Sequence, residues 1–288
     1  MSNLITRTIT GILFVTVIIV CISWNAYSCL ALFFLITVLG LWEFYTLIEK
    51  AGIKPQKILG IVIGIISFLG VSTNFAISII PNIDGILMDF YSRKFILISC
   101  SFILILFIIE LFLKSEKPFE NIAYTLLGLV YISIPFSFIP PLAQLPLCAY
   151  DSIYNPQILL GYFFLVWTND TGAYIVGSKF GKHKLFERIS PKKTWEGSIG
   201  GAVFSIVLAV ILSNYYTQLS LMNWIVVALI VVVFGTLGDL VESMFKRSLN
   251  IKDSGSILPG HGGILDRFDA VLLSAPFVFF YLFLISSF

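Results

Sequence analysis

Residues 222–247 read MNWIVVALIVVVFGTLGDLVESMFKR, a long apolar run that ends in a polar segment with charges of both signs. About 20 apolar residues span a bilayer as a helix, so the run predicts a membrane-spanning helix over 222–243. If the helix continues, Asp239, Glu242 and Lys246 share one face, because residues three and four apart are neighbours on a helix. A carboxylate at membrane depth is costly unless it is paired or hydrated, so this face is predicted to line a polar cavity.

The rest of the 288-residue chain has the same apolar character. Hydrophobic residues make up 58% of it and charged residues only 12%, whereas a soluble domain is about a quarter charged. The mean hydropathy is +0.98, which excludes a water-soluble fold. The fold class is therefore predicted to be all-α, a polytopic integral membrane protein with about nine transmembrane helices. The expected spans are 4–24, 28–48, 58–80, 95–113, 122–142, 158–178, 198–214, 222–243 and 270–287.

The chain is predicted to form one membrane domain over 1–288, because no repeat or long polar linker interrupts it. Within it, 1–157 contributes N-terminal spanning helices, and 158–288 is the catalytic region that holds the polar motifs. The first apolar run, Ile9 to Ile22, could mimic a secretory signal. Asn25 and Tyr27 break the small-residue pattern of a cleavage site, so we expect a retained helix.

Basic residues predict the orientation, because Lys and Arg collect on the cytoplasmic side of a membrane. With nine spans and a cytoplasmic N-terminus, 16 of the 18 Lys and Arg residues fall in cytoplasmic segments, and only Arg93 and Lys94 fall outside. This predicts a C-terminus outside. The two longest polar segments, 179–197 and 244–269, then face the cytoplasm, where a soluble nucleotide would meet the protein.

Acidic residues near the membrane interior differ between the two regions. Glu43 and Glu110 are interpreted as structural groups that snorkel or form caps at the cytoplasmic interface. Asp170 lies inside the predicted span 158–178 between polar neighbours, and an intramembrane carboxylate marks a functional site by default. Trp167 and Tyr174 share its helix face. The alternative for Asp170 is a hydrogen bond between helices.

A basic segment, Ser190-Pro191-Lys192-Lys193-Thr194-Trp195-Glu196-Gly197, precedes the span 198–214. One interpretation is a membrane anchor that obeys the positive-inside rule. The other is a phosphate site, because two lysines beside Ser and Thr hydroxyls lead into a helix N-terminus. The segment alone leaves both interpretations open.

The last polar segment, residues 252–269, reads KDSGSILPGHGGILDRFD. Its glycines allow sharp turns through which amide N–H groups approach a phosphate. Asp266 and Asp269 are three residues apart at the start of the last predicted span. Together with Asp239 they predict a pocket of hard oxygen ligands suited to Mg²⁺.

These motifs together resemble a known family. The run from Ser243 through Lys246-Arg247 and Lys252-Asp253 to His261-Gly262-Gly263, Asp266-Arg267 and Asp269 resembles the motif of the phosphatidate cytidylyltransferase (CDP-diacylglycerol synthase) family. The stretches 170–177 and 190–197 resemble its upstream motifs. The detailed resemblance covers residues 167–269, and the first half of the chain matches only as a run of spans.

The resemblance implies that CTP and phosphatidate give CDP-diacylglycerol and pyrophosphate, a step of phospholipid biosynthesis. It also implies Mg²⁺, in some members a monovalent cation such as K⁺ beside it, and a membrane-embedded homodimer. We expect no nucleic acid as a partner. Compact loops favour a bacterial inner membrane, with the active site facing the cytoplasm.

The attacking phosphatidate oxygen is already anionic near neutral pH, so the reaction needs positioning and charge neutralisation instead of a deprotonating base. The metal ligands are expected to be Asp239, Asp266 and Asp269. The catalytic residues are expected to be Asp170, Asp239, Lys246, Arg247, Asp266 and Arg267. Substrate phosphates are expected to meet Ser190, Lys192, Lys193, Thr194, Lys252, His261, Gly262 and Gly263.

Four alternatives belong to other functions. A CTP-dependent polyprenol kinase or an archaeal-lipid cytidylyltransferase would share the nucleotide site and differ in its lipid. A secondary transporter would use intramembrane carboxylates for ions, but no inverted repeat is visible and it needs no segment rich in Lys, Arg and Gly. A structural scaffold gives the buried charges no purpose.

Overall fold

The computed structural model describes residues 3–77, 85–145, 154–251, 254–255 and 262–286, and these are mostly helical. Every predicted span falls on a helix of the described chain. The chain divides into two compact units, residues 1–141 with 253–267 and residues 142–252 with 268–288. The sequence suggested a subdivision at residue 157 instead, and it did not assign 253–267 to the N-terminal helices.

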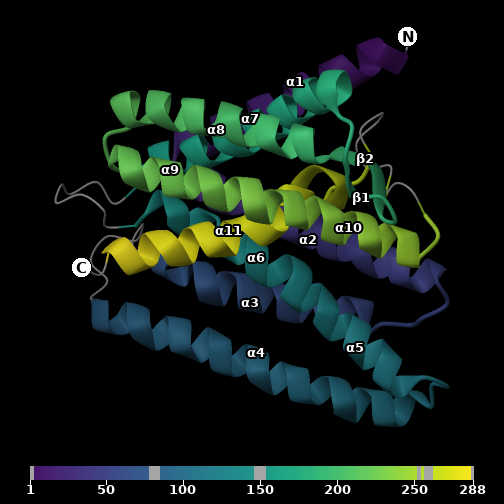
Figure 1. The fold of residues 1–288 in the computed structure, drawn as a ribbon. Coiled ribbons are helices and arrows are strands. Elements are labelled where there is room, and N and C mark those ends of the chain that lie inside the picture. Colours follow the sequence, from purple (N-terminus) through teal and green to yellow (C-terminus); the bar gives the residue numbers. More distant parts are fainter. Residues whose placement is uncertain (1–2, 78–84, 146–153, 252–253, 256–261, 287–288) are drawn as a thin grey trace. The chain divides into compact units, whose positions relative to one another are not determined.

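The first unit is built mainly of helices in its described residues (Figure 1). Tyr45 organises part of its core, since its hydroxyl donates to the carbonyl of Thr125 at 2.7 Å. A Cβ on Gly60 or Gly128 would lie within 3 Å of the Tyr45 ring, so both glycines let the helices approach. Its helices are α1 (Asn3–Trp24), α2 (Ala26–Lys50), α3 (Lys57–Ile77), α4 (Gly85–Leu113), α5 (Pro118–Gly128), η1 (Leu129–Ser133) and α6 (Ile134–Ser137); η2 (Pro140–Ala143) follows them.

The second unit packs its helices through glycines as well. Within it, α8 lies beside α7 and α9 (Figure 1). A Cβ on Gly200 would lie 2.4 Å from the Val176 side chain, so α7 and α8 can approach only with a glycine at that position. The unit comprises α7 (Gln157–Phe180), β1 (Lys184–Phe186), β2 (Ser190–Thr194), α8 (Trp195–Tyr215), α9 (Leu221–Ile230), η3 (Val231–Gly235), α10 (Thr236–Ser248) and most of α11 (Leu265–Ser286).

The all-α prediction missed a short antiparallel hairpin between α7 and α8. Lys184 pairs with Thr194, and Phe186 pairs with Ser190. The strands are too short and too rich in lysine to show the alternating apolar pattern of a half-buried strand. Strand β2 is the basic segment that the sequence singled out, so that segment is extended and leads directly into α8.

Five helices of the described residues are long and apolar enough to cross a membrane: Ala26–Lys50, Pro118–Ala143, Trp195–Tyr215, Leu221–Ser248 and Leu265–Ser286. Shorter apolar helices cover Thr8–Trp24, Lys57–Ser72 and Leu97–Leu113. The protein is therefore an integral membrane protein of helical fold. Helix α7, which carries Asp170, is not among these eight apolar segments; polar residues interrupt its sequence.

Candidate active site

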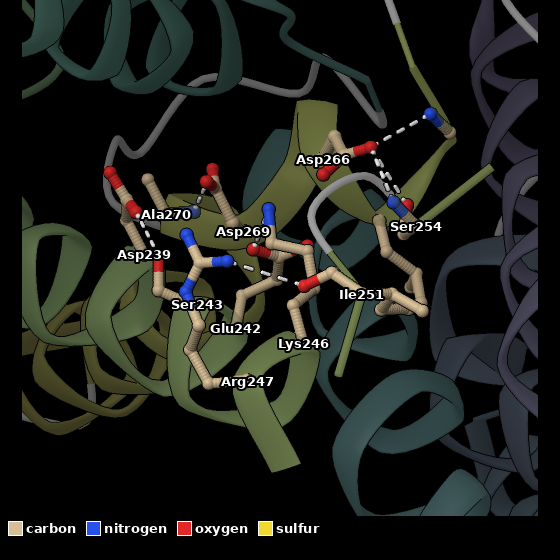
Figure 2. Close-up of polar contacts among 12 residues, drawn as sticks. Asp239, Glu242, Ser243, Lys246, Arg247, Ile251, Ser254, Asp266, Asp269 and Ala270 are labelled. Carbon is tan, nitrogen blue, oxygen red and sulfur yellow. Dashed lines mark hydrogen bonds and ion pairs between the residues drawn. The ribbon is translucent and has the colours of Figure 1, made fainter. Parts of the chain in front are cut away.

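The polar end of α10 carries the acidic stripe that the sequence predicts. Glu242 is completely buried, and its Oε2 lies 2.5 Å from Nζ of Lys246, one helical turn further on. Ser243 Oγ donates to Asp239 Oδ1 at 3.3 Å (Figure 2). The Lys246 cation compensates a charge that would otherwise be costly to bury. The predicted common face of these side chains is confirmed.

Asp269 brings α11 to the same carboxylates. Its Oδ1 accepts from the backbone N–H of Ala270 at 2.7 Å (Figure 2). Helices α10 and α11 approach closely here, because a Cβ on Gly238 would lie 2.4 Å from the Asp269 carbonyl oxygen. Three other carboxylates lie within electrostatic range of Asp269. We call the four together the acidic cluster: Asp170, Asp239, Glu242 and Asp269.

Asp170 reaches this cluster from α7. The helix is fixed on two sides, since the hydroxyls of Tyr162 and Ser274 lie 2.7 Å apart and join α7 to α11. On the other side, a Cβ on Gly201 of α8 would lie 2.5 Å from Oδ1 of the buried Asn169. Asp170 is exposed within its unit. A solvent-accessible carboxylate on a fixed helix has the placement that a binding group requires.

Lys193 connects the basic segment to the acidic cluster. Its Nζ lies 2.6 Å from Oδ2 of Asp239 and 3.5 Å from the carbonyl oxygen of Thr236. The two groups are 46 positions apart in the sequence, which gave no indication of this pairing. Lys192 on the same strand is exposed. Strand β2 therefore offers one cation to the cluster and one to solvent.

Helix α8 holds the hairpin through its first residues. The Glu196 carboxylate accepts from the backbone N–H of Lys182 at 3.1 Å and of His183 at 3.2 Å, and it lies 2.6 Å from the His183 ring. Thr194, predicted to bind substrate, is the N-cap of α8, and its hydroxyl accepts from the Gly197 N–H at 3.2 Å. The hairpin is thus tied to a helix at its base.

The glycine-rich segment belongs to the first unit. Asp266 Oδ2 accepts two hydrogen bonds of 2.9 Å, from the N–H groups of Ser254 and Gly263, and lies 2.9 Å from the Ser254 hydroxyl (Figure 2). Gly262 has a φ of +87°, so the predicted sharp turn is confirmed at this residue. The Gly263 amide, expected to bind phosphate, donates to Asp266 in this structure.

Glu43 is the residue near this segment that sequence reasoning left out of the site. It is 4% exposed on α2, and its carboxylate accepts from the backbone N–H of Ile264 at 2.8 Å and of Leu265 at 3.2 Å. The hydroxyl of Ser254 also donates to it. Glu43 is a capping group, as the sequence suggested, but the helix that it caps lies more than 200 positions later in the sequence.

The remaining predicted residues vary in placement. Arg247 is exposed, and its Nη1 donates to the carbonyl of Ile251 at 3.4 Å (Figure 2). Arg267 is exposed near the start of α11, and Ser190 is partly buried at the start of β2. Lys252 and His261 lie outside the described residues.

The predicted metal site contains the expected carboxylates, but they are not close enough together to coordinate one ion. Across the ranges that the structure describes, no three His, Cys, Asp or Glu side chains come close enough to hold a metal ion. Two acids of the cluster have lysine partners instead, Asp239 with Lys193 and Glu242 with Lys246. The donor chemistry suits a hard divalent cation, and binding would require the carboxylates to draw together.

Comparisons with known proteins point to one family. A profile of the cytidylyltransferase family matches residues 5–285, nearly the whole chain. A phosphatidate cytidylyltransferase of Staphylococcus saprophyticus is 38% identical over 237 residues, which are 82% of this chain and 85% of that protein.

Two further relatives carry the same name. The phosphatidate cytidylyltransferase of Bacillus subtilis is 40% identical over 190 residues, 64% of this chain and 66% of that protein. The one of Staphylococcus aureus strain COL is 42% identical over 182 residues, 62% of this chain and 65% of that protein. In these two alignments the chain spans slightly less than two thirds of its relative.

Proposed function

Because this chain belongs to the cytidylyltransferase family, it is a nucleotidyltransferase, and we propose that it transfers the CMP group of CTP to phosphatidate. The observation that carries the proposal is the acidic cluster with the Lys193 ammonium group bound to it. Such a group of anions and cations, held by packed helices and strand β2, suits a charged substrate and its counter-ions. The relatives named phosphatidate cytidylyltransferase support this lipid acceptor.

In the proposed reaction a phosphatidate oxygen bonds to the α-phosphorus of CTP, and the bond from that phosphorus to the bridging oxygen of pyrophosphate breaks. The phosphate monoester is anionic near neutral pH, so no base has to remove a proton. The protein's contribution is to align the two phosphates and to neutralise the charge of the leaving group. The products are CDP-diacylglycerol and pyrophosphate.

We propose Mg²⁺ as the cofactor, held by Asp239 and Asp269 of the acidic cluster. Asp266 precedes Asp269 by one turn on α11, and by this position it is proposed as the third ligand. The fit rests on donor chemistry, since carboxylate oxygens are the ligands that Mg²⁺ takes in proteins. When bound, the ion would supply positive charge to the phosphates. Asp170 would contribute as a ligand or by orienting one, and K⁺ is a proposed second cation.

Cationic side chains are proposed to bind the phosphate groups of CTP and the lipid. Lys193 and Lys246 are already held at carboxylates of the acidic cluster. Exposed arginines and lysines suit the pyrophosphate, because a guanidinium can bind two phosphate oxygens at once. The proposed phosphate-binding cations, exposed or not, are Lys192, Lys193, Lys246, Arg247, Lys252 and Arg267. His261, Gly262, Gly263, Ser190 and Thr194 are the proposed hydrogen-bonding partners.

The placement in the cell is proposed from charge distribution. Nine spans with a cytoplasmic N-terminus put 16 of 18 basic residues on the cytoplasmic side, together with both polar motifs. The bacterial relatives support the inner membrane as the location. A homodimer is proposed as the assembly. CTP would then reach the site from the cytoplasm and phosphatidate from the bilayer.

An assay with two differently labelled nucleotides tests the proposal. The purified protein in detergent micelles is incubated with phosphatidate, Mg²⁺ and CTP labelled at either the α- or the γ-phosphorus. We expect the α-label in a lipid product that requires phosphatidate and Mg²⁺. The γ-label in lipid would instead identify a kinase, and no labelled lipid from a folded preparation would exclude a lipid-directed CTP enzyme.

Asp239→Asn tests the site in the same assay. The variant keeps the side-chain shape but loses the charge that pairs with Lys193, so we expect activity to fall about 10²–10³-fold. Glu49→Gln is the matched control. The Glu49 carboxylate also pairs with a lysine, Lys57, at 3.1 Å, and neither residue belongs to a motif. Mg²⁺ should raise the melting temperature of the wild type and of the control, but not of Asp239→Asn. Equal activity in both variants would contradict the site.

A further inference from the structure

The start of α11 lacks a capping side chain of its own. The first N–H groups of a helix have no partner within the helix and need acceptors from elsewhere. The residues just before α11 are Gly262, Gly263 and Ile264, and none of them has a side-chain acceptor. Asp266, inside the first turn, accepts from the N–H of Gly263, which precedes the helix. The N–H groups of Ile264 and Leu265 therefore depend on another part of the chain.

Glu43 supplies both missing acceptors from α2. Its Oε2 accepts from the Ile264 N–H at 2.8 Å, and its Oε1 accepts from the Leu265 N–H at 3.2 Å. A carboxylate is also the favourable charge at a helix N-terminus, because the helix dipole is positive there. Glu43 thus acts as the N-terminal cap of α11 from a helix that is distant in the sequence.

The glycine-rich segment closes around this carboxylate. The hydroxyl of Ser254 donates to Glu43 and lies 2.9 Å from Oδ2 of Asp266. A Cβ on Gly263 would lie 2.0 Å from Oε1 of Glu43, and one on Gly255 would lie 2.9 Å from Oε2. Only glycines leave room for the carboxylate at these two positions. The 4% exposed Glu43 side chain is thus enclosed by the segment that it binds.

We propose that Glu43 is a positioning residue for the reaction: it fixes the start of α11 and the Ser254–Gly255 stretch, and so holds Asp266 in place. This inference rests on the proposed function, which assigns the chemistry to residues on α11. Asp266, Arg267 and Asp269 all follow within five residues of the two amides that Glu43 binds. A residue of the N-terminal helices, outside every sequence motif, thereby sets the geometry of the catalytic segment.

Glu43→Gln tests the proposal with little change in side-chain volume. A glutamine offers one acceptor oxygen, whereas Glu43 accepts on both oxygens, so one amide of α11 must face an NH₂ group. We expect kcat to fall about 10–100-fold, because a displacement near 1 Å can cost that much, while KM for CTP stays within about threefold. Hydrogen exchange of the peptide over 262–268 should become about tenfold faster.

Glu110→Gln is the matched control. Glu110 is a buried glutamate of the same unit, 3% exposed, and it accepts from Gln56 at 2.9 Å, from Asn121 at 2.7 Å and from Ser115. None of these partners lies in the motif segments. We expect Glu110→Gln to lower the melting temperature about as much as Glu43→Gln does, with kcat and the exchange of 262–268 unchanged.

The two readouts separate the possible failures. An unchanged kcat in Glu43→Gln, or a loss matched by Glu110→Gln, would overturn the positioning role and leave a structural one. Unchanged exchange over 262–268 would overturn the capping itself. A folded wild type without cytidylyl transfer would overturn the proposed function, and the exchange measurement would still decide whether Glu43 fixes α11.

Discussion

Gly262 shows how one residue can connect backbone conformation to the site. Its φ of +87° is strained for any other residue, at a cost of about 1 kcal/mol or more. A Cβ there would also lie 2.5 Å from Oδ2 of Asp266. We expect Gly262→Ala to displace this carboxylate and to lower kcat about tenfold or more, measured as the rate of CDP-diacylglycerol formation.

Gly52 offers the control for this prediction. It has nearly the same φ, +86°, and an added Cβ would meet nothing within 4 Å. Gly52→Ala should therefore lose comparable stability to strain, as seen in its melting temperature, and keep its activity. If both variants lost activity alike, backbone strain would explain the result and contact with Asp266 would not.

Single residues differed in how well the sequence revealed them. Asp170 and Asp239 could be predicted because a charge inside an apolar run is rare and therefore informative. Glu43 could not, because it lies near the polar end of its helix, where a glutamate is unremarkable. Its partner Ser254 is 211 positions away, and only the folded chain brings the two together. The Lys193–Asp239 pair escaped prediction for the same reason.

Among the elements, the hairpin and α8 are coupled through Thr194. This residue ends β2 and caps α8. Its hydroxyl also packs against Gly181, where an added Cβ would lie 2.7 Å from it. We expect Thr194→Ala to lose about 1 kcal/mol of stability and to loosen the strand that carries Lys193. The measurable effect should be a raised KM for CTP in the labelled-nucleotide assay.

Ser220→Ala is the comparison for that change. Ser220 is the N-cap of α9, and its hydroxyl accepts from the Asn223 N–H at 3.3 Å, but no predicted site residue adjoins it. The loss of stability should be similar and KM for CTP should not move. A raised KM in both variants would mean that general loosening of the helices, and not the hairpin, controls nucleotide binding.

Hydropathy could predict the helices but not their local irregularities. The described residues of each predicted span are mostly helical, because a run of apolar residues is the direct signature of a helix in a membrane. The π-helical turn η3 (Val231–Gly235) left no such mark. A π turn shifts the backbone hydrogen bonds by one residue without changing the residue types. It leads directly into α10 and so sets the rotation of the acidic stripe.

At the scale of the whole molecule, the positions of the charges say more about orientation than the net charge does. The net charge is only +2, yet both polar motifs and nearly all basic residues fall on one predicted side. That arrangement ties the orientation to the chemistry, since CTP is a soluble cytoplasmic nucleotide in the proposed reaction. Composition could predict a membrane protein, and loop charge predicts an orientation that the labelling experiment tests, whereas neither carries information on which helices pack together.

Two single-cysteine variants test the orientation. After replacement of Cys21, Cys29, Cys100 and Cys148, a cysteine is placed at the exposed Lys117 or at the exposed Thr217. The nine-span prediction puts Thr217 outside and Lys117 in the cytoplasm, because three predicted spans, an odd number, lie between them. A membrane-impermeant maleimide should therefore label Thr217→Cys in intact cells, and Lys117→Cys only after permeabilisation.

The pattern of labelling distinguishes the ways in which this topology can fail. Reversed labelling would mean that the chain is inverted, which would put the hairpin and the acidic cluster on the side without CTP. Labelling of both cysteines from one side would mean that the number of spans between them is even. Helix α7 is the span most open to doubt in this count, because the polar residues around Asp170 distinguish it from the apolar spans. Its status decides whether the Asp170 carboxylate lies within the membrane.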